Sequence, residues 1–238
     1  MQIVKITPQG DLTVSTSKMD YEDKKKFLAG WLEGVPFGRR HIGYINEESK
    51  LMDMPYNFLA TTLMGVSGSL LWPNDYLAGN CVCFGVYNED DEHDGDDHTC
   101  EDSFVTTAHQ LTDMFWDVNE AQLGIDRNEV IRPDGWMPLV PKTEIGFVAA
   151  WLQVVNGQIP ESRFELIAKL ICLHCVKAVA STTQHWEDLA QPSDVILETV
   201  AHSVIQQVSE ISHAEQLGKA FDAILDQRAE LWDIPKGA

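Results

Sequence analysis

The acidic segment, residues 88–103 with the sequence NEDDEHDGDDHTCEDS, holds the densest group of side chains that could bind a metal ion or move a proton. It contains nine carboxylates, two histidines and one cysteine, and it has no lysine or arginine. Carboxylate oxygens suit calcium, histidine and cysteine suit zinc, and a histidine oriented by a carboxylate can act as a general base. The segment is therefore a candidate calcium site, zinc site, catalytic centre or charged interaction surface.

A calcium site is suggested by spacing. Read from Asp90, the acidic segment follows an EF-hand loop, with Gly95 at the sharp turn and Glu101 at the final chelating position. However, Asp97 stands where such loops carry a hydrophobic residue, and Glu92 is long for its position. The preceding NCVCFGVY predicts a strand, whereas an EF-hand needs a helix there. We therefore expect an acidic loop that joins a strand to a helix.

A zinc site would use other side chains. Three pairs have short spacing: Cys81 with Cys83, His98 with Cys100, and Cys172 with Cys175. Both cysteine-only pairs lie in apolar runs, NCVCFGVY and KLICLHCVKAV, which is typical of buried structural thiols. We expect neither a metal nor another cofactor.

An enzyme is the alternative function, specifically a metal-dependent enzyme that uses the acidic and histidine side chains of residues 89–102. His93 or His98 could serve as a base beside the neighbouring aspartates. No nucleophile is evident beside them, and no glycine-rich phosphate-binding motif occurs in the chain. We therefore predict no catalytic residue.

Charge is unevenly distributed along the 238 residues, whose net charge is −20. Residues 1–60 carry eight acidic and eight basic side chains, so this part is neutral. Between Lys50 and Arg127 there are fifteen carboxylates and no lysine or arginine. Such a region repels nucleic acid and anionic membranes and attracts basic partners, although a charge run can also serve only solubility.

The first elements predicted are strands and a helix. QIVKI and DLTVST flank the turn sequence TPQG and predict a hairpin. Asp20 is a candidate N-cap for a helix whose apolar stripe includes Leu28, Trp31 and Leu32, with Gly34 just past its end. HIGYIN and KLMDM flank EES and predict a second hairpin.

Further helices follow in both halves of the chain. Residues 58–63 repeat apolar side chains at helical spacing, and a helix is predicted over about 106–117. From about residue 143 only helices are predicted, starting at Thr143, Pro160 and Ser193, with a last one carrying Leu217 to Trp232. The fold class predicted is α+β: antiparallel hairpins with two or three helices (1–121), then a helical subdomain (142–238).

Three stretches of the N-terminal half carry a resemblance: LAGWLEGV, GYINEESKLMDMPYNFLAT and LAGNCVCFG. The positions concerned are Gly30, Trp31, Tyr44, Asn46, Glu47, Lys50, Leu51, Pro55, Asn57, Ala60, Gly79 and Val82. This pattern resembles an uncharacterised domain-of-unknown-function family found in phage, plasmid and other mobile-element proteins. The resemblance covers roughly the first 115 residues. It implies an accessory protein of such an element and brings no catalytic residues with it.

Together these features predict an acidic phage- or plasmid-type accessory protein that binds and inhibits a basic host protein, by imitating nucleic acid or acting against host defence. The partner expected is a nucleic-acid-binding or defence protein; direct binding of nucleic acid or membrane is not expected, and a homodimer is an open alternative. The partner-binding residues predicted are Glu89, Asp90, Asp91, Glu92, Asp94, Asp96, Asp97, Glu101 and Asp102. No window is apolar enough to span a membrane and no export signal precedes the first strand, so a cytoplasmic protein is expected.

Overall fold

The computed structural model describes residues 1–71, 75–86, 97–127, 136–180 and 214–231. The chain forms two compact units. The α+β unit comprises Met1–Ser69, Tyr76–Trp116 and Ile125–Val140, and the helical unit comprises Leu70–Asp75, Asp117–Gly124 and Pro141–Ala238. The predicted α+β class is confirmed, with the strands in the N-terminal part and helices in the C-terminal part. None of the described helices is long and apolar enough to cross a membrane.

A five-stranded antiparallel sheet forms the centre of the α+β unit, in the order β2-β1-β5-β4-β3. The strands are β1 (Ile3–Ile6), β2 (Leu12–Ser15), β3 (Leu32–Pro36), β4 (His41–Asn46) and β5 (Cys81–Gly85). Strand β5 lies between the β1–β2 and β3–β4 hairpins, with Cys83 opposite Val4 and Phe84 opposite Ile42. All its residues are buried, which explains why CVCFG lacks alternating polar positions.

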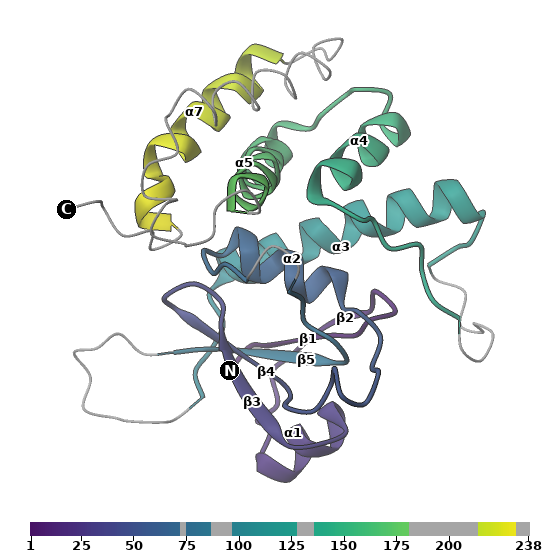
Figure 1. Cartoon of the computed structure of the whole chain (residues 1–238), viewed down its shortest axis with the longest axis vertical. Coiled ribbons are helices and arrows are strands. Elements are labelled where there is room, and N and C mark those ends of the chain that lie inside the picture. Colours follow the sequence, from purple (N-terminus) through teal and green to yellow (C-terminus); the bar gives the residue numbers. More distant parts are fainter. Residues whose placement is uncertain (72–74, 87–96, 128–135, 181–213, 232–238) are drawn as a thin grey trace. The chain divides into compact units, whose positions relative to one another are not determined.

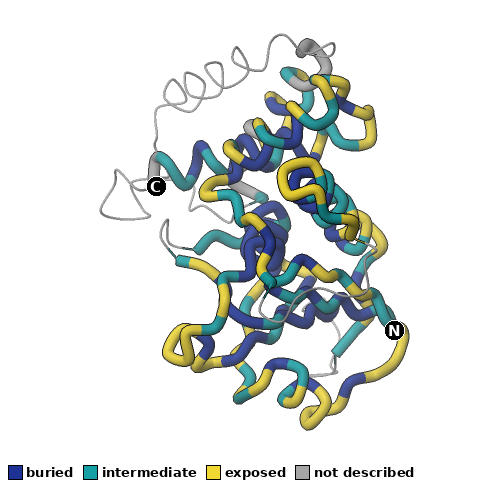
Figure 2. The backbone as a smooth tube through the Cα atoms, turned by 90° about the vertical axis from the view of Figure 1, so that its right-hand side faces the viewer, coloured by how far each residue is buried: buried dark blue, intermediate teal, exposed yellow. Residues whose placement is uncertain are grey.

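Helices cover both faces of this sheet (Figure 1). On one face, α1 (Tyr21–Leu28) contributes Leu28 to a core cluster with Ile3, Val82 and Phe84. On the other lie α2 (Phe58–Val66) and the first part of α3 (Asp102–Leu123), joined by stacking of Phe58 on Phe115 with ring centroids 5.9 Å apart. Buried residues concentrate at the centre of the unit and exposed residues in its loops (Figure 2).

Helix α1 is shorter than predicted. Asp20 is its N-cap, because its side chain accepts from the Asp23 amide at 2.8 Å, but the helix ends at Leu28 rather than continuing through Leu32. Ala29 adopts a left-handed conformation with φ 58°, and its amide donates to the Lys25 carbonyl, which closes the helix. Trp31 is consequently 56% exposed, and Leu32 begins β3.

The second hairpin was predicted with the wrong partner. HIGYIN forms β4, but β4 pairs with the upstream β3, and KLMDM forms turns instead of a strand. The cause is Asn46, whose side-chain oxygen accepts from the Glu48 amide at 2.8 Å and turns the chain. Leu51 in this turn is 86% exposed.

Helix α3 was predicted over 106–117 and extends further in both directions, from Asp102 to Leu123. Its buried stripe starts at Phe104 and continues to Val118 and Asn119. The polar residues at both ends of the helix concealed this length, because they lack an apolar repeat.

The helical unit confirms the first two predicted C-terminal helices. Helix α4 (Glu144–Val154) begins at Thr143, whose hydroxyl accepts from the Gly146 amide at 3.1 Å, and it ends before Asn156 and Gly157 in left-handed conformation. A 3-10 turn, η1 (Glu161–Arg163), follows Pro160 and leads into α5 (Phe164–Ala180). The last helix is α7 (Ala214–Leu231), while the helix predicted from Ser193 lies outside the described residues.

Candidate functional site

A short backbone pairing joins Gly85, which precedes the acidic segment, to His98 within it. Gly85, the last residue of β5, exchanges two backbone hydrogen bonds with His98, both 3.0 Å long. The next residue, Val86, donates its amide to the Arg40 carbonyl at 2.9 Å. Residues 87–96 lie outside the described part of the chain, which resumes at Asp97. We call residues 85–86 and 97–101 the base of the acidic segment.

Glycine is required at this base. A Cβ atom on Gly85 would lie 2.2 Å from the carbonyl oxygen of Thr99, which no side chain tolerates. The absence of that atom allows the returning strand to approach β5 closely enough to pair. The FG sequence at the end of β5 therefore determines where the segment is attached.

A buried lysine anchors the returning chain. Lys24 of α1 is only 8% exposed, and its ammonium forms an ion pair with Asp97. The same ammonium lies 4.5 Å from the centroid of the Tyr44 ring and 4.6 Å from that of Phe84, so two aromatic faces stabilise its charge. Burial raises the pKa of Tyr44, and the negative charge of Asp97 raises it further. The carboxylate of Asp97 therefore has an intramolecular partner, the ammonium of Lys24.

A second pair closes the other side of the base. Arg40 Nη1 lies 2.7 Å from Glu101 Oε1, in a pair that is largely exposed and so contributes little stability. The hydrogen bond from Arg40 is the main cause that lowers the pKa of Glu101. The Glu101 amide also donates to His41 Nε2 at 3.2 Å.

His41 is a structural residue of this base. It is 6% exposed and stacks on Phe104, with ring centroids 4.1 Å apart. Burial lowers the pKa of His41, and the charge of Arg40 acts in the same direction against that of Glu101. A neutral ring with an accepting Nε2 suits the hydrogen bond from the Glu101 amide.

The cysteines near the base are buried thiols. Cys81 and Cys83 have sulfur atoms 3.8 Å apart, and Cys100 Sγ donates to the Cys83 carbonyl at 3.3 Å. Burial raises the pKa of Cys83 far above its usual value and that of Cys100 to about 12. Cys175 on α5 is likewise raised, to about 11. With no metal bound, Cys83, Cys100 and Cys175 are therefore protonated at neutral pH.

The nine predicted partner-binding carboxylates divide into two groups. Six lie outside the described residues: Glu89, Asp90, Asp91, Glu92, Asp94 and Asp96. Three are described, and each contacts another part of the chain: Asp97 binds Lys24, Glu101 binds Arg40, and Asp102 accepts from Gln2 Nε2 at 3.2 Å. His93 also lies outside the described part, and across the residues that are placed no cluster of three or more His, Cys, Asp or Glu could hold a metal ion.

Sequence reasoning missed Lys24. It lies in YEDKKKFL as the first of three consecutive lysines, and composition cannot distinguish them. One signal was present: Lys24 stands four residues before Leu28, the buried end of the helix stripe, so both lie on the same helix face. Its partner Asp97 has no such signal.

A separate cluster of ionisable side chains lies inside the helical unit. Glu144 of α4 is 8% exposed, with Oε1 2.5 Å from Lys177 Nζ and Oε2 3.8 Å from His174 Nδ1, both on α5. Burial by itself raises the pKa of Glu144, but His174 and Lys177 outweigh it and hold this pKa at about 2. The cluster joins the two helices.

Glu144 should make the stability of the helical unit depend on acid. Since its pKa falls from 4.5 to about 2 on folding, its ionised form stabilises the fold above pH 4.5, and this is lost as pH falls toward 2. We expect Glu144→Gln to reduce unfolding free energy by about 2 kcal/mol at neutral pH and by little near pH 2. Denaturant unfolding across this pH range tests it, with Glu165→Gln, an exposed residue of α5, as control. A gap between wild type and Glu144→Gln that stays constant with pH would contradict this role.

No protein-family model matches this chain, and neither the curated proteins nor the solved structures contain a match to it.

Proposed function

We propose that this protein is an acidic accessory protein of a phage or plasmid that binds and inhibits a basic host protein, using the acidic segment as its contact surface. The proposal rests on one observation. The base is held by the pairing of Gly85 with His98, and two carboxylates of the segment form ion pairs there. Asp97 and Glu101 neutralise Lys24 and Arg40. The six carboxylates from Glu89 to Asp96 lie outside the described residues, and we assign them to the partner contact because of their charge.

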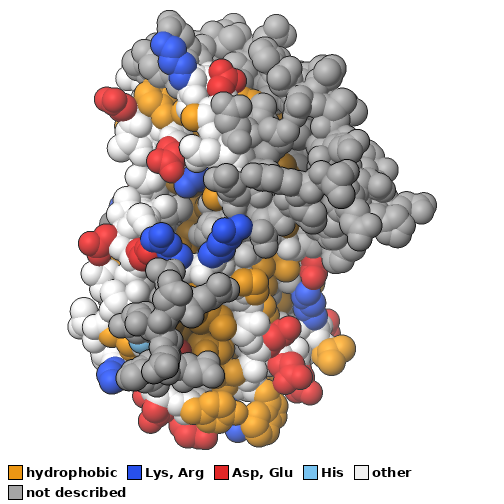
Figure 3. Space-filling view, turned by 90° about the vertical axis from the view of Figure 1, so that its left-hand side faces the viewer, with side chains coloured by type: hydrophobic (Ala, Val, Ile, Leu, Met, Phe, Trp, Pro, Cys, Tyr) orange, Lys and Arg blue, Asp and Glu red, His pale blue; other side chains and the backbone are white. Residues whose placement is uncertain are grey.

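The distribution of charge near the segment supports this separation of anchoring carboxylates from partner-binding carboxylates. No lysine or arginine occurs in sequence between Lys50 and Arg127, and the two basic residues at the base are already paired. On the face drawn in Figure 3, the described residues include both acidic and basic side chains. Six like charges within eight residues form a strong local field, which accelerates association with a basic surface.

The segment would inhibit a nucleic-acid-binding protein by occupying the basic surface that binds the nucleic acid. A protein that binds nucleic acid presents lysine and arginine at phosphate spacing, and a tethered row of carboxylates can occupy that site. Binding should therefore weaken steeply with salt and should compete with nucleic acid, because both ligands use the same basic groups.

The test is affinity capture from host lysate on the immobilised full chain, followed by mass spectrometry. We expect a basic protein to be retained at low salt, released at moderate salt, and displaced by added duplex or single-stranded nucleic acid. Retention of a partner that neither salt nor nucleic acid releases would contradict the proposal.

A further inference from the structure

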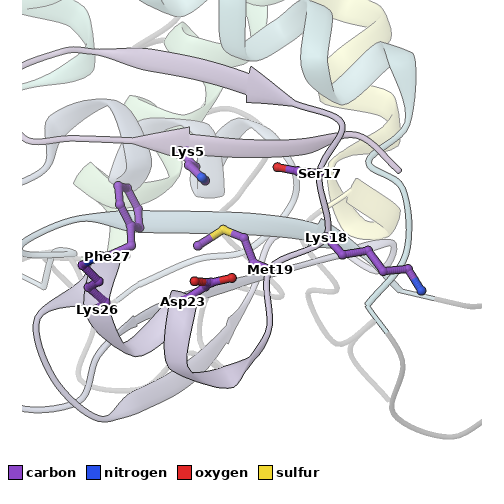
Figure 4. Close-up of a pocket in the computed structure, with 7 residues that line it drawn as sticks. All are labelled: Lys5, Ser17, Lys18, Met19, Asp23, Lys26 and Phe27. Atoms are coloured by element: carbon purple, nitrogen blue, oxygen red, sulfur yellow. The ribbon is translucent and has the colours of Figure 1, made fainter.

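A cavity of about 510 Å³ opens in the α+β unit between α1 and the β1–β2 hairpin (Figure 4). Lys5 of β1 and Phe27 of α1 lie beside each other in its wall, and Asp23 and Lys26 come from the same helix as Phe27. Ser17 and Lys18 belong to the connection from β2 to α1, with Lys18 extending outward at the rim. The volume lies within the range of small-molecule sites, about 300–1,000 Å³.

Three lysines, Lys5, Lys18 and Lys26, line this one cavity. Lys5, Lys18 and Lys26 have no ion-pair partner among the side chains that the structure places, although Asp23 lines the same cavity. Other cations of α1 are engaged: Lys24 binds Asp97, and Lys25 lies 4.0 Å from the centroid of the Trp31 ring. The cavity is thus lined by three positive groups and one negative group.

Lys5 is a charged residue on a covered face of the sheet. It lies on the sheet face that carries Ile3, the face that α1 covers, where an apolar residue would be expected. Its ammonium lies 5.6 Å from the centroid of the Phe27 ring. The cavity therefore presents a cation and an aromatic ring next to each other.

These side chains specify a ligand with three chemical parts. Lysine ammonium groups bind phosphate as point charges, and the aromatic face of Phe27 can stack on a flat ring. The carboxylate of Asp23 accepts a hydrogen bond from an amino or hydroxyl group. A nucleotide carries all three: phosphate, flat base, and hydroxyl or amino donors.

The charge of the chain limits the size of an anionic ligand that the cavity can bind. A long polyanion would extend beyond the cavity and be repelled by the net charge of −20 that the chain carries. A mononucleotide stays within roughly one Debye length, about 8 Å at physiological salt, of the three lysines. We propose that this cavity binds a small phosphorylated ligand of the nucleotide class, an activity separate from the partner binding proposed above.

The test is a titration of the full chain by nuclear magnetic resonance and calorimetry with ADP, adenosine, inorganic phosphate and a 5′-phosphorylated dinucleotide. We expect saturable binding of ADP, with shifted amide signals around residues 17–19 and 23–27, and weaker binding of adenosine and of inorganic phosphate. Tighter binding of the dinucleotide than of ADP would contradict the proposed limit on ligand size.

Single-charge variants decide whether the cavity is responsible. Lys5→Gln and Lys26→Gln should each weaken ADP binding by about tenfold, because each removes a charge-assisted contact with phosphate. Lys142→Gln, the same change at an exposed residue of the helical unit, should leave it unchanged. Equal weakening by Lys142→Gln, equal affinity for inorganic phosphate and ADP, or no saturable ADP binding would each overturn the proposal.

Discussion

Replacing Lys24 with alanine should lower the free energy of unfolding by about 3 kcal/mol, because it leaves Asp97 in a mostly buried position without its cation. The side chains of Lys24 and Asp97 are only 11% and 18% exposed, so water replaces little of the lost interaction. The change also removes a cation from the faces of Tyr44 and Phe84. Denaturant unfolding measures the loss.

Lys26→Ala is the matched control, since Lys26 lies two residues further along the same helix and is exposed. It should change stability by less than about 0.5 kcal/mol. A double variant, Lys24→Met with Asp97→Asn, should recover most of the loss because neither buried charge remains. If Lys24→Ala is no more destabilising than Lys26→Ala, Lys24 does not anchor the base.

Asn57→Ala should be comparably destabilising, by about 3 kcal/mol, through loss of three buried hydrogen bonds. Asn57 is fully buried; its side-chain oxygen accepts from the Ala60 amide at 3.0 Å and caps α2. Its side-chain nitrogen donates to the carbonyls of Ile6 at 3.2 Å and Gly79 at 2.9 Å. One side chain therefore joins β1, the chain entering β5, and α2.

Thermal or denaturant unfolding tests this, with Asn80→Ala as comparison. Asn80 is half-buried, and its side-chain nitrogen makes one hydrogen bond, to the Phe27 carbonyl at 2.7 Å. It should cost about 1 kcal/mol. A smaller loss for Asn57→Ala than for Asn80→Ala would show that the network around Asn57 is not what joins these elements.

The elements that sequence predicts well are those whose signals are local. The β1–β2 hairpin and α4 follow from a turn sequence or from a cap next to an apolar repeat, and the structure confirms both. The central strand CVCFG was evident as a short apolar run. These features need no information from distant parts of the chain.

What sequence could not predict depends on tertiary contacts. The end of α1 at Leu28 involves Gly30, where a Cβ would lie 2.3 Å from Asn46 Nδ2, and no local signal announces that approach. The pairing of β4 with β3 in place of KLMDM depends on the turn that Asn46 makes. The anchor Lys24–Asp97 joins residues 73 positions apart.

At the candidate site, too, composition is predictable from sequence and tertiary contacts are not. The excess of carboxylates is a property of composition and was visible at once. The division of those carboxylates between anchoring and partner binding was not, because it depends on where Lys24 and Arg40 lie in the fold. Asp97, which sequence assigns to the partner surface, forms an ion pair with Lys24 in the base.

The variant that tests the acidic segment must therefore retain Asp97. The segment variant replaces six carboxylates with their amides: Glu89, Asp90, Asp91, Glu92, Asp94 and Asp96. A control with the same change in net charge replaces six exposed carboxylates elsewhere: Glu22, Glu33, Glu47, Glu48, Glu161 and Asp222. We expect both variants to keep the stability of the wild type, which denaturant unfolding checks before binding is measured.

The most direct measurement is the association rate of each form with the captured partner at low salt. The account predicts that the segment variant associates at least about tenfold more slowly than wild type, while the control stays within about twofold, because steering depends on where the charges lie. The advantage of the wild type should disappear at high salt. If the segment variant associates as fast as the wild type at low salt, the acidic segment does not contact the partner and the proposed function is wrong.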